Sequence, residues 1–315
     1  MVWSIDSIPE QNGRIALITG ANSGLGFDTA EALLEKNATV ILGCRSIKKA
    51  KEARDRLLSK TSYGTIELLN IDLSDLVQVN KAADQVGSVF QKLDLLINNA
   101  GVMAPPRTCS KQGLELQFAV NHLSHMALTL KLLPLMVNQS GARVVTVTSG
   151  AQYMGKINWS DLQGEENYDP WASYSQSKLA NVMFSLELDQ RLKESDVNIA
   201  SLSAHPGLAR TNLQPTTIAA NGSWQASIAY KLMNPIFQSS RMGALSQLLA
   251  ATDPKAKSGE QYGPRFNFRG YPNLCEVASS ALNNKERKRL WEVSEKLIGD
   301  LVQINPTKEI LSKNK

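Results

Sequence analysis

A tyrosine and a lysine stand four positions apart in the stretch WASYSQSKLANVMF, which covers residues 171 to 184. If this stretch is helical, Tyr174 and Lys178 lie one turn apart on the same face. The positive charge of a lysine favours the phenolate form of a nearby tyrosine, whose pKa is ordinarily ~10. The pair could therefore exchange a proton with a bound substrate. The same spacing also arises by chance or in a polar helix start, so chemical partners have to be found elsewhere in the chain.

Three glycines occur where an apolar run, RIALITG, gives way to a segment of helical period. In the sequence TGANSGLG they are Gly20, Gly24 and Gly26. A turn from a first strand into a first helix aims backbone N–H groups and the positive helix end at a phosphate, and glycine lets the backbone approach closely. Tight turns also favour glycine, but the position after the first strand of a βαβ unit favours a dinucleotide site.

The end of the second apolar run, ILGCRS, indicates which dinucleotide would bind. A cofactor with a free ribose 2′-hydroxyl favours an Asp or Glu here, whereas the sequence has Arg45, followed closely by Lys48 and Lys49. An arginine can bind the oxygens of a 2′-phosphate in bidentate fashion. The sequence therefore predicts NADP(H) rather than NAD(H), unless these basic residues only solvate the start of a helix.

Apolar, β-branched runs of strand length alternate along the chain with longer amphipathic segments. The predicted strands lie in RIALITG, TVILGC, TIELLNI, LDLLINNAG, ARVVTVTSG and VNIASLSAHPG, and the predicted helices cover 24–36, 46–60, 75–91, 113–138, 170–194 and stretches between 222 and 252. Strands that are apolar on both faces indicate an α/β fold of the Rossmann type, a single doubly wound parallel sheet with helices on both faces. In ENYDPW, Asp169 is expected to cap the helix 170–194 and Pro170 to occupy its first position.

No linker-like segment interrupts this pattern, so we expect a single domain over residues 1–315. Its core would cover about 14–253. The remainder, 254–315, begins with a Gly/Pro/aromatic stretch that fits a last strand and an irregular loop, and it ends with a final helix.

The bulk composition excludes several classes of function. The chain has 34 basic and 29 acidic residues spread along its length, whereas nucleic-acid binding needs basic residues clustered on one face, so we expect no nucleic-acid partner. The cysteines and histidines are Cys44, Cys109, Cys275, His122, His125 and His205. Their spacing matches neither a metal site nor a hydrolase triad, so we expect no metal and structural histidines. The lack of paired cysteines, of a leader pattern and of a run of ~18 apolar residues predicts a soluble, cytoplasmic protein.

Several motifs taken together make the chain resemble the short-chain dehydrogenase/reductase family over roughly residues 14 to 253. In chain order the motifs are Thr19-Gly20-x-x-x-Gly24-x-Gly26, Asp72 in NIDLSD, Asn98-Asn99-Ala100-Gly101, Asn121 in FAVNHLSH, Ser149 in VTVTSGA, Tyr174-x-x-x-Lys178, and Pro206-Gly207 with Thr211 in HPGLARTNL. Within the family, INWSDL, YSQSKLAN and LWEVSEKL are most similar to the retinol-dehydrogenase-like and WW-domain oxidoreductase-like branch.

The resemblance implies an NADP(H)-dependent oxidoreductase that interconverts a carbonyl and an alcohol by hydride transfer. Tyr174 would act as general acid and base, and Lys178 would lower its pKa and hold the nicotinamide ribose. Ser149 would hydrogen-bond the substrate oxygen, and Asn121 would support a water molecule that relays protons to bulk. Taken singly, Ser149 could merely end a strand, Asn121 could interrupt a buried helix, and Tyr174 could serve in packing.

The resemblance also implies which residues surround the cofactor. They are Gly20, Ser23, Gly24, Leu25, Gly26, Arg45, Asp72, Leu73, Asn99, Ala100, Gly101, Tyr174, Lys178, Pro206, Gly207 and Thr211. The segment 212–240 is expected to form a lid over a lipophilic substrate, although its large side chains could equally belong to the core. Those side chains are Trp224, Tyr230, Met233 and Phe237. Family members often pair through helices at 113–138 and 170–194, which would allow a homodimer.

The chain departs from compact family members between Ser149 and Tyr174, where the extra stretch QYMGKINWSDLQGEENYDP is expected to lie over or beside the substrate pocket. A displaced Ser149 would lose the role that the resemblance gives it. Light-dependent protochlorophyllide reductases share such an insertion, so reduction of a ring C=C bond is an alternative activity. Those enzymes usually carry cysteines near the NNAG position and just after the lysine, where this chain has none. A second alternative is a non-catalytic NADP(H)-binding sensor or scaffold, which would need the glycine turn but not the catalytic residues.

Overall fold

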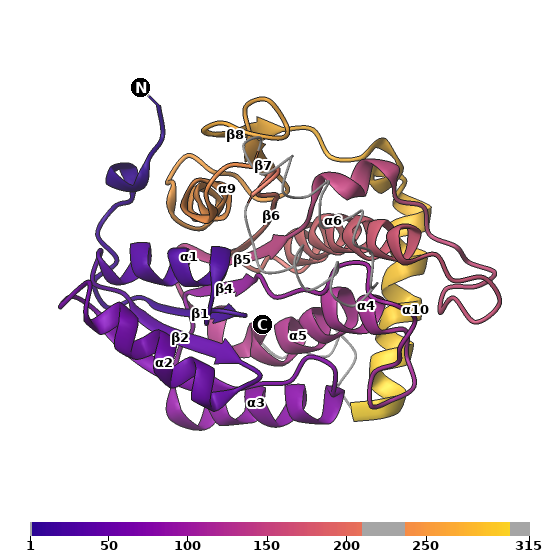
Figure 1. The fold of residues 1–315 in the computed structure, drawn as a ribbon, viewed down its shortest axis with the longest axis horizontal. Coiled ribbons are helices and arrows are strands. Elements are labelled where there is room, and N and C mark those ends of the chain that lie inside the picture. The colour runs from indigo at the N-terminus through magenta and orange to yellow at the C-terminus, as the bar shows by residue number, and fades with distance from the viewer. Residues whose placement is uncertain (1, 210–236, 303–315) are drawn as a thin grey trace, which may run out of the picture.

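The computed structural model describes residues 2–209 and 237–302, which form an eight-stranded sheet in the order β3-β2-β1-β4-β5-β6-β7-β8 (Figure 1). The strands are β1 (Ile15–Thr19), β2 (Thr39–Cys44), β3 (Thr65–Asn70), β4 (Leu95–Asn98), β5 (Ala142–Val147), β6 (Ile199–Ala204), β7 (Gln261–Pro264) and β8 (Pro272–Cys275). The α-helices are α1 (Gly24–Leu34), α2 (Ile47–Leu58), α3 (Leu76–Val89), α4 (Leu116–Phe118), α5 (Ser124–Met136), α6 (Pro170–Glu194), α9 (Ser240–Thr252) and α10 (Asn284–Val302). The predicted doubly wound α/β fold is confirmed.

The central strands are buried on both faces, which explains their continuous apolar sequences. Successive side chains of a strand point to opposite faces, and in β1 Leu17 enters one apolar core while Ala16 and Ile18 enter the other. Strand β1 pairs in parallel with β2 and with β4, so that Leu17 lies opposite Ile41 on one side and Leu96 on the other. The parallel pairs need crossover connections, which the amphipathic segments supply as helices.

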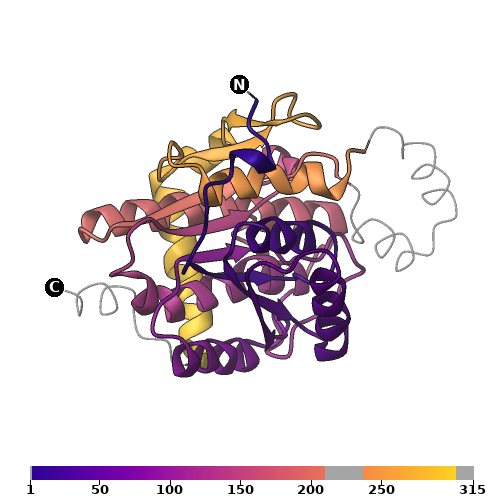
Figure 2. The same ribbon diagram turned by 90° about the vertical axis from the view of Figure 1, so that its left-hand side faces the viewer.

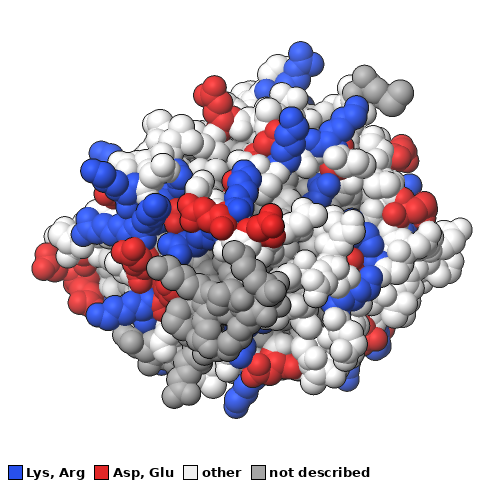
Figure 3. Space-filling view, turned by 180° about the vertical axis from the view of Figure 1, so that it is seen from behind, with Lys and Arg blue, Asp and Glu red and all other residues white. Residues whose placement is uncertain are grey.

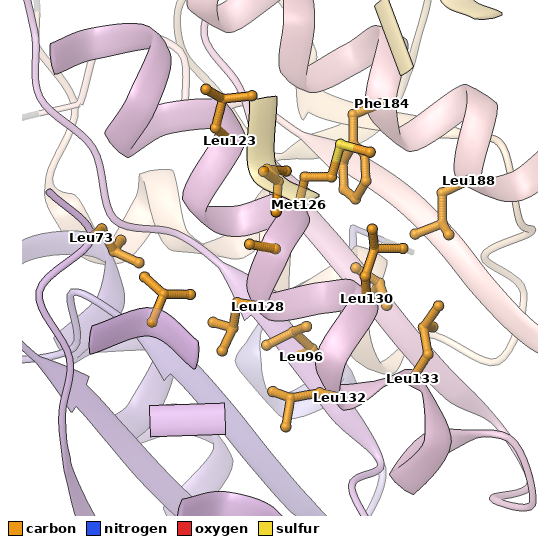
Figure 4. Close-up of a cluster of buried hydrophobic side chains, with 14 of the residues drawn as sticks. Leu73, Leu96, Leu123, Met126, Leu128, Leu130, Leu132, Leu133, Phe184 and Leu188 are labelled. Atoms are coloured by element: carbon orange, nitrogen blue, oxygen red, sulfur yellow. The ribbon is translucent and has the colours of Figure 1, made fainter. Parts of the chain in front are cut away.

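The two cores lie on opposite faces of the sheet. Helices α1, α2 and α9 bury Phe27, Leu57 and Leu248 on one face. Helices α3, α5 and α6 cover the other face, and the C-terminal helix α10 packs across α6 and α3 (Figures 1 and 2). Figure 4 shows how α5 contributes a row of leucines to this second core, where they meet Leu96 of β4 and Phe184 of α6.

Helix α6 covers the predicted residues 170–194, and its N-terminus is capped as expected. The carboxylate of Asp169 accepts a hydrogen bond from the backbone N–H of Ala172 at 2.6 Å. Pro170 occupies the first turn, where its missing N–H costs nothing. These contacts fix the start of the helix that carries Tyr174 and Lys178.

Two parts of the fold differ from the sequence prediction. After β6 the sequence predicted one last strand in a parallel sheet, but β7 is parallel to β6 and a further strand, β8, is antiparallel to β7. The connection between β7 and β8 is too short for a crossover, so the chain reverses in a hairpin. The predicted helix 113–138 starts at Leu116 and includes a π-helical turn, Ala119–Leu123, before α5 begins.

The surface gives no sign of one continuous charged field on the face shown in Figure 3, where basic and acidic side chains are interspersed. Within residues 2–209 and 237–302, no helix combines the length and the apolar character needed to span a membrane. In the same part of the chain, no group of histidine, cysteine and acidic residues is arranged to hold a metal ion.

Candidate active site

The carboxyl ends of β1 and β4 meet where the strand order of the sheet reverses. From β1 the chain proceeds outward to β2 and β3, and it then crosses back so that β4 pairs with the other side of β1. In open α/β sheets, ligands bind in the crevice outside the carboxyl ends of the strands at such a point. The glycine turn after β1 and the NNAG segment after β4 both border this crevice.

The glycine turn packs closely against the loop that follows β4. A Cβ on Gly26 would lie 2.6 Å from both Asn99 Nδ2 and the carbonyl oxygen of Gly20, so a side chain there would force a shift. Thr19 joins the two loops, because its Oγ1 accepts from the backbone N–H groups of Asn99 at 2.9 Å and of Ala100 at 3.0 Å. Asn99 Nδ2 in turn donates to the Thr19 carbonyl at 2.7 Å. The predicted cofactor residues of the two loops therefore lie together.

The start of α1 has the features of a phosphate site. The N–H groups of Gly24, Leu25 and Gly26 belong to the first turn, where no helical carbonyl can accept them. Ser23, which precedes the helix, makes no side-chain hydrogen bond that caps it. Gly24 has a φ of +56°, and a Cβ there would meet open space. The N–H groups of the first turn, the Ser23 hydroxyl and the open space at Gly24 together fit the pyrophosphate of a dinucleotide.

A cavity of about 200 Å³ extends from this turn across the ends of β1 to β4. Its lining includes Gly20, Arg45, Asp72, Leu73, Ala100 and Gly101. Asp72 Oδ1 accepts from the backbone N–H of Ser74 at 2.9 Å and from its hydroxyl at 2.7 Å. Arg45 is exposed and makes no ion pair with any described residue. The cavity thus joins six of the residues predicted to surround the cofactor.

A larger hollow, of about 850 Å³, lies between the N-terminal segment and the β7–β8 hairpin. Its lining includes Trp3, Tyr262, Phe266 and Tyr271, and none of the predicted site residues. The candidate active site is therefore located by its predicted catalytic and cofactor-binding side chains, and not by the volume of the cavity.

Tyr174 and Lys178 lie on the buried side of α6, facing the end of β5. Tyr174 is 6% exposed and Lys178 is 4% exposed. Lys178 Nζ lies 5.8 Å from the centroid of the Tyr174 ring and donates to the carbonyl of Val147 at 3.3 Å. Ser149 follows β5, begins a short 3-10 helix, Gly150–Met154, and forms a side-chain hydrogen bond with Tyr174. The structure therefore brings Ser149, Tyr174 and Lys178 together.

Burial controls the proton affinities of this group. It raises the pKa of Tyr174, and the hydrogen bond with Ser149 opposes that rise. Burial also lowers the pKa of Lys178 to about 8, because the ammonium group loses contact with water. The sequence predicted that Lys178 would lower the pKa of Tyr174, but in this structure burial outweighs any such effect. A lower phenol pKa therefore requires a further positive charge nearby, such as that of an oxidised nicotinamide ring.

Asn121 lies in the π-helical turn before α5 and is buried. Its Oδ1 accepts from the backbone N–H of Val102 at 2.8 Å, and its Nδ2 donates to the Val102 carbonyl at 3.0 Å and to Ser177 Oγ at 2.9 Å. A Cβ on Gly101 would lie 3.1 Å from Asn121 Oδ1 and 3.4 Å from Lys178 Nζ. Asn121 and Lys178 therefore approach the same glycine, and the fourth predicted catalytic residue joins the other three.

Pro206 and Gly207 follow β6 at the same edge of the sheet. Gly207 has a φ of +62°, and a Cβ there would lie 2.5 Å from the carbonyl oxygen of Phe268. Gln238 Nε2 donates to the Pro206 carbonyl at 2.7 Å. The hairpin loop and Gln238 thus hold the Pro206-Gly207 turn, which was predicted to lie beside the cofactor.

Part of the sequence prediction lies outside the described residues. This applies to Thr211 and to the lid residues Trp224, Tyr230 and Met233. Phe237, the last of the predicted lid residues, is described and is buried. The roles of Thr211 and of the lid remain predictions.

The insertion before α6 packs against the loop that follows β4. The hydroxyl of Tyr168 donates to the Pro105 carbonyl at 3.1 Å and accepts from Gln117 Nε2 at 2.9 Å. Ser149 keeps its hydrogen bond with Tyr174. The insertion therefore does not displace Ser149.

Two residues to which the sequence analysis gave no catalytic or cofactor role, Ser177 and His125, contact the predicted catalytic residues. Ser177 Oγ accepts from Asn121 and donates to the carbonyl of Tyr174 at 2.8 Å. His125 lies within hydrogen-bond distance of Thr19 Oγ1, at 2.9 Å, and of the Asn121 carbonyl, at 3.0 Å. Spacing was the available signal, because Ser177 follows Tyr174 by three positions and His125 follows Asn121 by four.

The chain is similar to known proteins over most of its length. A family model described as short chain dehydrogenase matches residues 14–221. Retinol dehydrogenase 12 of Mus musculus is 34% identical over 292 residues, which cover 91% of this chain and 87% of that protein. Among solved structures, an uncharacterized protein from Mycobacterium paratuberculosis has a TM-score of 0.78 and 36% identity, with 95% of this chain and 98% of that chain covered. The Pseudomonas aeruginosa RhlG/NADP active-site complex has a TM-score of 0.63 and 25% identity, with 81% of this chain and 95% of that chain covered.

Proposed function

The protein belongs to the short-chain dehydrogenase/reductase family, and from this premise we propose that it is an alcohol and carbonyl oxidoreductase that prefers NADP(H) to NAD(H). Its membership makes it an NAD(P)-dependent oxidoreductase. The proposal adds the NADP(H) preference, a lipophilic substrate and the role of Tyr174 as general acid and base. It also adds a cytoplasmic location, whose reducing conditions suit the free thiols of Cys44, Cys109 and Cys275.

The position of Arg45 is the main support for the proposed preference for NADP(H). It stands at the end of β2, at the rim of the cavity, where an acidic residue would otherwise accept hydrogen bonds from a ribose 2′-hydroxyl. Its guanidinium is exposed and unpaired within the described residues, so it can bind a 2′-phosphate without breaking another contact. Lys48 and Lys49 are exposed close behind it and add positive charge. The similar Pseudomonas aeruginosa protein is described as a complex with NADP.

The arrangement of the side chains supports a separate role for each predicted catalytic residue in the reaction. A bound nicotinamide would supply or accept the hydride. In the reducing direction Tyr174 donates its phenolic proton to the substrate oxygen, while Ser149 hydrogen-bonds the same oxygen and holds it beside the phenol. Lys178, with its pKa at about 8, is mostly protonated near neutral pH and stabilises the phenolate that remains. Asn121 holds the loop that contacts Lys178 and supports a water molecule that returns the proton.

The surroundings of Tyr174 support a lipophilic substrate. The ring of Trp171 lies edge-on to that of Tyr174, with the centroids 6.1 Å apart, and Trp171 is 55% exposed. A large, exposed aromatic side chain beside the proton donor offers an apolar surface to the carbon skeleton of a substrate. The similar Mus musculus protein is named for retinol, which is a lipophilic alcohol.

A screen of carbonyl compounds with NADPH and, in parallel, with NADH tests the proposal. We expect turnover of lipophilic aldehydes or ketones with a kcat/KM at least ~10-fold higher for NADPH. The change Arg45→Ala should lower the NADPH value about 10- to 100-fold, since a charge-assisted contact contributes ~1.5–3 kcal/mol, and should leave the NADH value unchanged. Arg54→Ala is the matched control, because Arg54 lies on the following helix, α2, and is paired with Asp55 at 2.9 Å. Equal use of both cofactors by the unmodified protein would refute the role given to Arg45.

A further inference from the structure

His125 is a buried histidine whose two ring nitrogens both have partners. It is the second residue of α5 and is 1% exposed. Its Nδ1 lies 3.0 Å from the carbonyl oxygen of Asn121, and its Nε2 lies 2.9 Å from Thr19 Oγ1. The first partner stands directly in the predicted proton relay, and the second stands at the glycine turn.

The partners fix the tautomer of this ring. A carbonyl oxygen only accepts, so Nδ1 must carry a proton and donate it to Asn121. Burial lowers the pKa of His125 to about 4, and the positive charge of Lys178 acts in the same direction, so the ring is neutral. Nε2 therefore carries no proton and accepts the hydroxyl proton of Thr19.

The direction of the second bond matters for the cofactor loop. Thr19 has one hydroxyl hydrogen. When this hydrogen points at His125 Nε2, the lone pairs of Oγ1 face the N–H groups of Asn99 and Ala100 and accept hydrogen bonds from them. Without His125 the nearest alternative acceptor for that proton among the described residues is the Ile97 carbonyl at 3.5 Å, the outer limit of a hydrogen bond. The orientation of the hydroxyl thus depends on His125.

The direction of the first bond matters for Asn121. Its carbonyl belongs to the π-helical turn, where the backbone hydrogen-bond spacing changes before α5 begins. A side chain one helical turn later donates to that carbonyl and so holds the irregular turn in one conformation. The side chain of Asn121 in turn holds Val102, on the same loop as Asn99 and Ala100.

We propose that His125 is a positioning residue that couples the cofactor-binding loop after β4 to Asn121 by holding Thr19 with one nitrogen and the Asn121 carbonyl with the other. It acts through Thr19 and Asn121, which hold the loop that carries the predicted cofactor residues Asn99 and Ala100. The turnover part of this inference rests on the proposed function, whereas the tautomer and the cofactor affinity do not.

Two substitutions separate the two halves of the bridge. In His125→Gln the side-chain carbonyl reaches the position of Nε2 and can accept from Thr19, but nothing donates to Asn121. In His125→Asn the amide reaches the position of Nδ1 and can donate to Asn121, but Thr19 loses its acceptor. A hydrogen bond contributes ~0.5–1.5 kcal/mol net, or about 2- to 10-fold in a constant. We expect Gln to lower kcat by that factor with NADPH affinity retained, and Asn to raise the NADPH dissociation constant by that factor with kcat at saturation retained.

His122→Gln is the matched control. His122 is also a buried histidine next to α5, but its Nε2 bonds Ser294 Oγ on α10, at 2.8 Å, away from the cofactor loop. This change should lower the melting temperature and leave NADPH affinity and kcat per folded molecule unchanged. If the His125 variants behave in the same way as this control, with unchanged NADPH affinity and kcat, the role of His125 is only structural and the inference is overturned.

A direct measurement of the tautomer does not require turnover. Nuclear magnetic resonance of the full chain labelled with ¹⁵N-histidine yields signals from only three histidines. We expect one ring to remain neutral and protonated at Nδ1 between about pH 6 and 9, and the signals of this ring to disappear in both His125 variants. If the His125 ring, identified by the signals lost in both variants, is protonated at Nε2 or titrates near pH 6–7, the bridge is contradicted. A wild-type protein without turnover on any carbonyl compound would instead count against the proposed function, and the NADPH titrations and the tautomer would still decide the role of His125.

Discussion

The ammonium group of Lys178 is buried and has few hydrogen-bond acceptors in place of the water that it loses on folding. Its ammonium group donates to the Val147 carbonyl at 3.3 Å, and burial lowers its pKa from 10.5 to about 8. Between these two values the unfolded chain binds more protons at this site than the folded protein does, so the free energy of unfolding rises with pH. The charge that suits the chemistry of Tyr174 therefore weakens the cofactor-free fold at neutral pH.

The change Lys178→Met tests this cost, because it keeps the volume of the side chain and removes its charge. The full cost is present below pH ~8 and disappears as the pH rises to ~10.5, at about 1.4 kcal/mol per pH unit at most. We expect the variant to be more stable than the wild type at pH 7, and its advantage to shrink by about 1 kcal/mol per unit between pH 8 and 10. Urea unfolding of both proteins measures the difference, in which the titrations of groups distant from Lys178 cancel. A difference that does not vary with pH would contradict the lowered pKa.

Trp171 provides a second prediction at the scale of a single residue. Its ring is 55% exposed and lies 6.1 Å from the ring of Tyr174. Trp171→Ala should raise KM about 2- to 10-fold for bulky lipophilic carbonyl compounds, since aromatic contacts contribute ~0.5–1.5 kcal/mol, and should leave kcat nearly unchanged. Trp171→Phe should recover part of the loss. Tyr63→Ala removes an equally exposed ring, 61% exposed and distant from α6, and should change neither constant. A uniform rise in KM for small and bulky substrates would argue against a contact with the carbon skeleton.

The elements of the fold were largely predictable because their boundaries have local chemical causes. Strand β2 ends at Cys44 and α6 starts at Pro170 as predicted, since the end of an apolar run and an Asp-Pro cap are signals in the sequence itself. The π-helical turn at Ala119–Leu123 was not predictable. A helical period of apolar residues does not show whether the backbone hydrogen bonds join residues five positions apart, as in a π-helix, or four positions apart, as in an α-helix. The contacts of Ser177 with Asn121 and of His125 with Thr19 were also missed, since they depend on which elements the fold brings together.

The packing of the short 3-10 helix Gly150–Met154 against α6 determines where Ser149 stands relative to Tyr174. Gly155 ends this helix, and a Cβ there would lie 2.5 Å from the Ser175 carbonyl oxygen and 2.8 Å from Leu179 Cβ. The backbone of this segment therefore approaches α6 as closely as only a glycine allows.

Gly155→Ala should push the two elements apart. We expect the unfolding free energy to fall by about 1–3 kcal/mol, the usual cost of overpacking, and kcat to fall with it because Ser149 moves away from the phenol. Gly87→Ala is the control, since Gly87 lies in the exposed face of α3 and a Cβ there meets nothing within 4 Å. That change should raise stability by roughly 0.5–1 kcal/mol and leave kcat unchanged. Stability measured by denaturant unfolding and kcat at saturation separate the two effects, and a fully active, fully stable Gly155→Ala protein would show that the close packing is not required.

At the scale of the whole molecule, the C-terminal helix α10 bears on how copies of the chain could pair. The family resemblance allows a homodimer through the helices that the structure describes as α5 and α6. In this structure α10 packs across that face of the molecule (Figure 1). Its Trp291 stacks on Phe184 of α6, with the ring centroids 5.6 Å apart and an interplanar angle of 14°. The guanidinium carbon of Arg191 lies over the Trp291 ring, 4.5 Å from its centroid. A dimer through α5 and α6 would therefore require α10 to leave its place.

We accordingly expect the full chain to elute with the mass of one copy, 34.5 kDa, in size-exclusion chromatography with light scattering. Trp291 is 2% exposed, so Trp291→Ala should cost about 3–5 kcal/mol of stability and loosen α10. The apolar surface of Phe184 would then be uncovered, and we expect association that increases with protein concentration. Leu58→Ala, which removes a 58% exposed side chain on α2, should leave both mass and stability unchanged. A wild-type dimer in which the amides of α5 and α6 are protected from hydrogen exchange on association would show that α10 does not block this face, whereas a dimer that protects other surfaces would leave the argument for α10 intact.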